Sequence, residues 1–162
     1  MLTYSRKGNK TDGYTFYWED LNGKEVADYD FPRGSSLWVN TNAQIDFTQS
    51  GAVNKEATVV TIPGDSGFAQ AGNCTPVPLK LSALVFSNIA RYDTIQLFDQ
   101  NGDVSEMLTY SRKGNKTDGY TFFWEDLNGN EINADTYTFA PGQVFWVNCA
   151  DAGTVTIPAL SL

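Results

Sequence analysis

The chain has 162 residues, a formal net charge of −8, no histidine and two cysteines. This charge disfavours nucleic acid as a partner, because nucleic-acid binding normally requires a basic face. The lack of histidine removes the commonest general base and most zinc sites, and no apolar segment is long enough to span a membrane. Abundant threonine, valine and aromatic residues, with many glycine, asparagine and aspartate residues for turns, predict an all-β protein.

One stretch of sequence occurs twice. Residues 1–23 return as residues 107–129 with a single change, Tyr17 to Phe123. Met1 therefore matches Met107, and we expect it to be an ordinary position of the repeat. Identity at exposed polar positions is not needed for core packing, so it indicates either a recent duplication or two sites with the same role. Shorter matches follow, pairing residues 37–40 with 145–148 and residues 61–63 with 156–158.

The first copy reads as a series of short strands. Residues 14–19 alternate cleanly, which predicts a strand with Tyr14, Phe16 and Trp18 on one face and Tyr17 on the other. Asn22-Gly23 follows, a dipeptide typical of hairpins whose two central residues have positive φ. The other expected strands of this copy are residues 2–7, 36–40, 42–50 and 58–62.

The second copy is preceded by strands that the first copy lacks. They are expected at residues 68–73, 79–86 and 94–99, followed by an Asn101-Gly102 hairpin and by the repeated strands up to residue 157. Residues 64–162 therefore form a complete unit with an opening and a closing half, whereas residues 1–63 form a half-repeat with closing strands only. We expect an antiparallel β-sandwich built from one and a half repeats.

A half-repeat leaves strand edges uncovered, which β proteins avoid. Three resolutions are open: the sequence is a fragment, the half-repeat packs on its own neighbour, or another chain completes it. Completion by another chain is β-augmentation, and repeated head to tail it builds a filament.

Aromatic residues are the main candidates for a functional face. Core packing is the default for those that recur at alternating positions, which are Tyr14, Phe16, Trp18 and Trp38 and their counterparts Tyr120, Phe122, Trp124 and Trp146. Tyr17 and Phe123 point to the opposite strand face and are expected to be partly exposed, where aromatic rings stack on sugars or are covered at protein interfaces. An assembly or ligand face is therefore expected among these residues.

Other side chains are weaker candidates. Cys74 and Cys149 each follow an asparagine at the end of a strand-like run, so they form either a disulfide or two free thiols. Asp99, Asn101 and Asp103 offer oxygen ligands at alternate positions, as calcium loops do, but turn chemistry accounts for them equally. The adjacent carboxylates at 19–20 and 125–126 point to opposite strand faces, so neither pair flanks one glycosidic bond.

Several segments resemble a unit found in secreted surface proteins of bacteria, notably of the Verrucomicrobia type. They are Gly-Phe-x-x-Ala-Gly-Asn-x-Thr-Pro at 67–76, Asp-x-Ile-Gln-Leu-Phe-Asp-x-Asn-Gly at 93–102, Met-Leu-Thr-Tyr at 107–110 and Pro-Gly-x-x-Phe-Trp-Val at 141–147. The resemblance implies an exported, β-rich repeat at the cell surface or outside the cell, with no assigned chemistry.

From these features we expect a non-catalytic structural protein without a cofactor. Its expected partners are copies of itself, assembled through the half-repeat by strand complementation into a filament or surface layer. The alternative is an adhesive or carbohydrate-binding module that holds polysaccharide on exposed aromatic residues.

Overall fold

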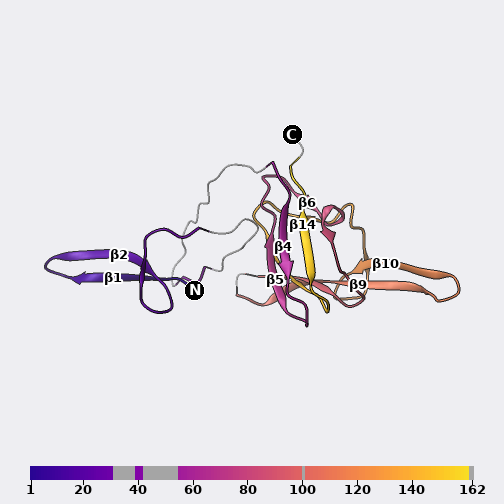
Figure 1. Cartoon of the computed structure of the whole chain (residues 1–162), viewed down its shortest axis with the longest axis horizontal. Helices are drawn as coiled ribbons and strands as arrows, with labels where there is room; N and C mark the ends of the chain where they lie inside the picture. Colours follow the sequence, from indigo (N-terminus) through magenta and orange to yellow (C-terminus); the bar gives the residue numbers. More distant parts are fainter. Residues whose placement is uncertain (31–38, 42–54, 100, 161–162) are drawn as a thin grey trace. The chain divides into compact units, whose positions relative to one another are not determined.

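The computed structural model describes residues 1–30, 39–41, 55–99 and 101–160 of the chain (Figure 1). The chain divides into two compact units, Met1–Pro32 and Arg33–Leu162, and each is described by itself. The expectation of an all-β fold is confirmed, since the regular structure of the described residues consists of antiparallel strands and one short 3-10 turn. Within this described part, no helix is long and apolar enough to cross a membrane.

The first unit is a three-stranded meander in the order β1-β2-β3. Its strands are β1 (Thr3–Asn9), β2 (Gly13–Glu19) and β3 (Glu25–Val26). Asn9 closes the β1–β2 turn, because its Oδ1 accepts the backbone N–H groups of Thr11 and Asp12 at 2.8 and 3.0 Å. Gly8 is required beside this turn, since its φ is +104° and an added Cβ would lie 2.2 Å from the Gly13 carbonyl oxygen.

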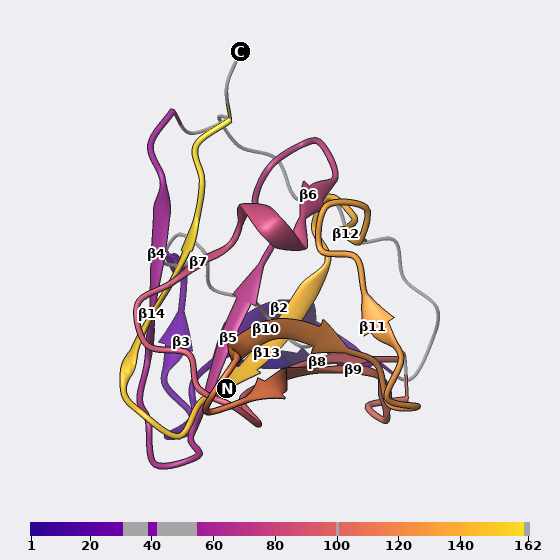
Figure 2. The same ribbon diagram turned by 90° about the vertical axis from the view of Figure 1, so that its right-hand side faces the viewer.

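The second unit contains a six-stranded sheet in the order β11-β10-β9-β8-β13-β5 and a three-stranded sheet in the order β4-β14-β7, together with the pair β12-β6. Figure 2 shows β4, β7 and β14 standing together on one side of this unit, with β8, β9 and β10 on the other. The strands of the six-stranded sheet are β5 (Phe68–Gly72), β8 (Thr94–Phe98), β9 (Val104–Asn115), β10 (Gly119–Glu125), β11 (Glu131–Ile132) and β13 (Val144–Asn148). The remaining strands are β4 (Thr58–Ile62), β6 (Leu79–Lys80), β7 (Val85–Phe86), β12 (Thr138–Phe139) and β14 (Gly153–Ile157).

The core of the second unit lies between these layers. Strand alternation sends Phe145 and Val147 of β13 inward, where they join Ile62 of β4 and Val155 of β14 in one cluster of buried residues. Such burial is the main stabilising contribution to a sandwich. Sandwich-like layering is therefore present in the second unit.

The boundary between the units differs from the expected one after residue 63. Strand β4, which belongs to the half-repeat by sequence, pairs along its full length with β14 of the complete repeat. Its side chains Thr58 and Ile62 are buried in the core of the second unit. The first copy is therefore divided, with its meander in one unit and its last strand in the other.

A single strand over residues 79–86 is not formed. This segment contains β6, a 3-10 turn at Leu81–Ala83 and β7. The physical reason is that its two ends pair with different sheets, β6 with β12 and β7 with β14. Leu81 and Leu84 are buried as expected for an apolar run, but Val85 is exposed.

The Asn-Gly turns also differ from the expected type. Among the described residues other than glycine, only Asp65, Ser66 and Tyr92 have positive φ, so Asn22 does not. Of the two residues of this dipeptide, Gly23 has positive φ, and its N–H donates to the Asp20 carbonyl oxygen at 3.1 Å. Five-residue loops are thus formed in place of two-residue turns. The expected strands at 36–40 and 42–50, and Trp38, fall wholly or partly outside the described residues.

Candidate interaction site

The repeated hairpin has two chemically different faces. On the polar face of the second copy, the Ser111 hydroxyl donates to Glu125 at 2.7 Å, and Lys113 forms an ion pair with Glu131 at 2.6 Å. The Lys113 ammonium also lies 5.1 Å from the centre of the Phe123 ring. Polar side chains therefore surround Phe123, which is half-buried.

The first copy reproduces this polar face. Ser5 donates to Glu19 at 2.7 Å, and Lys7 pairs with Glu25 at 2.6 Å and lies 5.1 Å from the Tyr17 ring. The hydrogen bond and the charge of Glu25 raise the pKa of Lys7. The Tyr-to-Phe difference between the copies thus falls at a position where the ring contacts a lysine.

The opposite face of the hairpin is aromatic. The second-copy aromatic face consists of Tyr110, Tyr120, Phe122 and Trp124, and the first-copy aromatic face consists of Tyr4, Tyr14, Phe16 and Trp18. Strand pairing sets Tyr110 opposite Trp124 and Tyr4 opposite Trp18. The rings of Tyr110 and Phe122 are stacked with centroids 5.5 Å apart, and those of Tyr4 and Phe16 are stacked at 5.7 Å.

An arginine extends each aromatic face. The guanidinium of Arg112 lies 4.1 Å from the Tyr120 ring centre, and that of Arg6 lies 4.6 Å from the Tyr14 ring centre. Contacts of this kind are cation–π interactions. Tyr4, Tyr110 and the two arginines were not predicted as site residues, although their recurrence in the repeat is visible in the sequence, because only the cross-strand register brings them beside the tryptophans.

Exposure differs from expectation along these faces. Tyr120 and Phe122 are 43% and 47% exposed, although their alternation predicts core positions. The reason is that the tip of the β9–β10 hairpin extends beyond the other described strands of the second unit (Figure 1). Trp124, nearer the base of the hairpin, is only 8% exposed, as core packing predicts.

The two tryptophans of the repeat lie in different environments. Trp124 is covered by Phe86 of β7, whose ring centre lies 5.9 Å away. Trp18 has the same neighbours on its own hairpin but is 47% exposed. Among the described residues, its sheet consists of β1, β2 and β3 and contains no strand equivalent to β7. The same tryptophan is therefore part of the core in one copy and half-exposed in the other.

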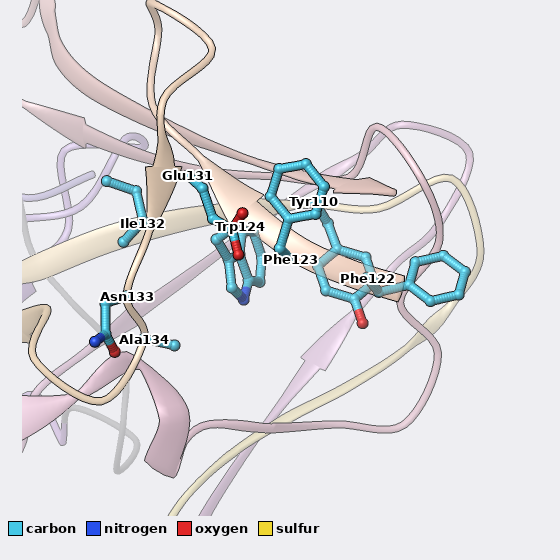
Figure 3. A pocket seen from close by; sticks show the side chains of 8 residues that line it. All are labelled: Tyr110, Phe122, Phe123, Trp124, Glu131, Ile132, Asn133 and Ala134. Atoms are coloured by element: carbon cyan, nitrogen blue, oxygen red, sulfur yellow. The ribbon is translucent and has the colours of Figure 1, made fainter. Parts of the chain in front are cut away.

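A groove of about 650 Å³ lies beside β10 and β11, and it is lined by Tyr110, Phe122 and Trp124 of the aromatic face together with Phe123 and Glu131 of the polar face. Figure 3 shows Trp124 in its middle, Tyr110 and Phe122 at one end, and Asn133 and Ala134 at the other. Its lining combines flat aromatic rings with one carboxylate and one amide. This mixture suits a ligand that offers both apolar faces and hydroxyl groups.

Trp146 lies apart from this groove. It points to the outer side of the six-stranded sheet, where its ring centre is 5.4 Å from Phe68 and 5.2 Å from Phe98. The pairing of β13 with β8 and of β8 with β9 places Tyr110 on the opposite, inner side of this sheet. The structure therefore does not bring the expected aromatic candidates of the second copy into one site.

The cysteines do not form the disulfide that was one of the two expectations. Both thiols are free. Cys74 follows β5 beyond Gly72, while Cys149 follows β13 beyond Asn148, and antiparallel pairing sets Asn148 opposite Phe68 at the far end of β5. The two sulfurs thus lie at opposite ends of the strand pair, roughly 14 Å apart along the strands at least. Burial, followed by the charge of Asp93, raises the pKa of Cys149 to about 12.

The candidate calcium loop is a hydrogen-bonded turn. Asp99 Oδ1 accepts the backbone N–H groups of Asn101 and Asp103 at 2.8 and 3.1 Å, and these bonds lower the pKa of Asp99. Asp126 closes its own loop in the same way. No cluster of three or more acidic or cysteine side chains able to hold a metal ion occurs among the described residues.

Comparisons with protein-family models, curated protein sequences and solved structures gave no significant match.

Proposed function

We propose that this protein is a non-catalytic structural module that assembles with other polypeptides through its half-repeat, at a bacterial surface or outside the cell. The observation that carries the proposal is the contrast between Trp18 and Trp124. One hairpin sequence is present twice, and its tryptophan is covered by β7 in one copy and half-exposed in the other, beside rings that are exposed in both. Large exposed apolar faces of this kind mark sites of association.

The polar groups of the hairpin support a structural role. Glu125 and Glu19 accept hydrogen bonds from serines, while Asp126 and Asp20 bind the backbone of their loops. These carboxylates stabilise turns and strand pairs, and the same arrangement is kept in both copies. The acidic composition and the resemblance to secreted surface repeats favour an extracellular location.

Light scattering and negative-stain imaging of the full chain test this role. Assembly that increases with protein concentration is expected in non-denaturing buffer. Replacing Phe16 with serine should reduce assembly, because it removes an exposed ring from the open face. The matched control is Tyr17→Phe, which lies on the polar face and reproduces the second copy, so it should leave assembly unchanged. A strictly monomeric protein at all concentrations would exclude the proposal.

A polysaccharide-binding role is the second candidate. Tyr120 and Phe122 remain exposed even in the complete repeat, and the groove beside them is lined by rings and polar groups. Soluble β-glucans or xylan should then protect tryptophan fluorescence from iodide quenching while the protein stays monomeric. Substituting Phe122 with serine should abolish that protection.

A further inference from the structure

Two strands that pair in the second unit are copies of each other. Strand β4 ends the first repeat and β14 ends the second, and the sequences Val60-Thr-Ile-Pro and Val155-Thr-Ile-Pro align them. In the observed register, Val60 pairs with its own counterpart Val155. The flanking pairs mirror each other, Thr58 with Ile157 and Ile62 with Gly153. Exchanging the two strands reproduces the pairing, so a local two-fold axis relates them.

This symmetry identifies the two edges of β4. Because the pairing is self-complementary, β4 and β14 use equivalent edges to contact each other. The other edge of β14 is occupied by β7, with Val155 opposite Phe86 and Thr156 opposite Val85. The outer edge of β4 is therefore the counterpart of the edge that holds β7.

No described strand pairs with this outer edge, since β4 stands at the end of its sheet. Its residues Thr58–Ile62 include no charged side chain and no proline. Natural edge strands are usually protected by such residues. The outer edge of β4 therefore has neither a described partner strand nor the usual protecting residues.

Strand β7 has two contacts in the complete repeat. It pairs with β14, and its Phe86 covers Trp124. The half-repeat contains a counterpart of each contact, in β4 and in Trp18, and neither has the corresponding partner among the described residues. Strand β7 is engaged by β14 and Trp124, so the described residues offer no second strand of this type to β4.

We propose that the outer edge of β4 binds, in trans, a strand of the β7 type from another polypeptide that carries an opening half. The donor strand would run antiparallel to β4 and place its phenylalanine opposite Val60. Main-chain hydrogen bonds would supply affinity and the alternating side chains of the donor strand would set the register, as in other cases of β-augmentation. The proposal rests on the role in assembly proposed above and names the site and the partner.

Disulfide trapping tests this register directly. The probe is a synthetic peptide with the sequence of residues 79–90 and cysteine at the position of Phe86. The full chain carries Val60→Cys together with Cys74→Ser, which removes the exposed native thiol. Directly opposed residues of antiparallel strands have Cα atoms about 4.5–5.5 Å apart, within the range that a disulfide spans. A mixed disulfide between peptide and chain, detected by mass spectrometry, is expected.

The control places the cysteine on the equivalent edge that is already filled. A chain with Val155→Cys should give at least tenfold less cross-linked product, because its own β7 occupies that edge. Equal yields at both positions, or a yield no higher than with a shuffled peptide, would overturn the proposal.

The outcome is separable from that of the proposed function. A chain that assembles in solution but does not trap the peptide overturns the assignment of the β4 edge alone. A chain that traps the peptide but stays monomeric at all concentrations overturns the role in assembly and supports the binding edge.

Discussion

Substituting each tryptophan of the repeat with alanine should have unequal effects on stability. Trp124 is 8% exposed and Trp18 is 47% exposed, although their neighbours along the hairpin are identical. The difference of 39 percentage points (47 − 8), on a residue surface of about 250 Å², amounts to roughly 100 Å² of buried area. At about 25 cal/mol per Å², Trp124 contributes about 2.5 kcal/mol more than Trp18.

The free energy of unfolding of the Trp124→Ala chain should therefore fall by about 3–5 kcal/mol, the usual range for truncation of a buried aromatic residue. The Trp18→Ala chain should lose about 2.5 kcal/mol less of its free energy of unfolding. Urea denaturation followed by circular dichroism and by the fluorescence of the remaining tryptophans measures both values. The presence of two copies provides an internal control, since the local sequence around the two positions is the same. Equal losses in the two variants would refute the view that the β7 layer distinguishes the copies.

Three further predictions concern single groups. A maleimide at pH 8 should label Cys74 and leave Cys149 unmodified in the folded protein, because burial raises the pKa of Cys149 to about 12. Mass spectrometry should show one adduct per chain, and two adducts would contradict the buried placement of Cys149. Gly114→Ala should destabilise the hairpin more than Gly119→Ala, because only at Gly114 would the new Cβ also meet a carbonyl oxygen, at 2.3 Å. Gly119→Ala should cost about 1–2 kcal/mol for its positive φ alone. Thermal unfolding measures the order of the two variants, and a reversed order would be inconsistent with the turn geometry. The pKa of Asp126 is lowered, mainly by its hydrogen bonds to Asn130, so its contribution to stability is present above the unfolded pKa of about 3.9 and is lost as pH falls through the folded pKa. The stability of the Asp126→Asn variant should therefore depend less on pH below about 4. An unchanged acid-unfolding profile would exclude a stabilising role for the Asp126 carboxylate.

The polypeptide sequence was sufficient to predict the fold class. Alternating residues such as those of 14–19 predict strands where they are observed, and the repeated sequence identifies the two hairpins without any knowledge of long-range pairing. These features are local, because a strand period and a turn depend on neighbouring residues. The turn type was predicted less well, since Asp20 and its counterparts close longer loops through their carboxylates.

Long-range pairing could not be predicted in the same way. Strand β4 lies far from β14 in the sequence, and only their register reveals the local two-fold axis. The crossing of residues 79–86 between two sheets likewise depends on partners elsewhere in the chain. Disulfide formation was open for the same reason, because cysteine distances depend on which ends of paired strands meet.

By itself, then, the sequence determined that the chain is all-β and that one aromatic hairpin occurs twice, because both properties follow from the order of neighbouring residues. Only the tertiary structure decided which of the two hairpin tryptophans is buried. Trp18 and Trp124 have the same sequence neighbours, but within the second unit Trp124 is covered by β7, a strand that is not adjacent to it in the sequence. Burial is a property of layers in contact, and identical segments acquire different environments when only one of them is covered.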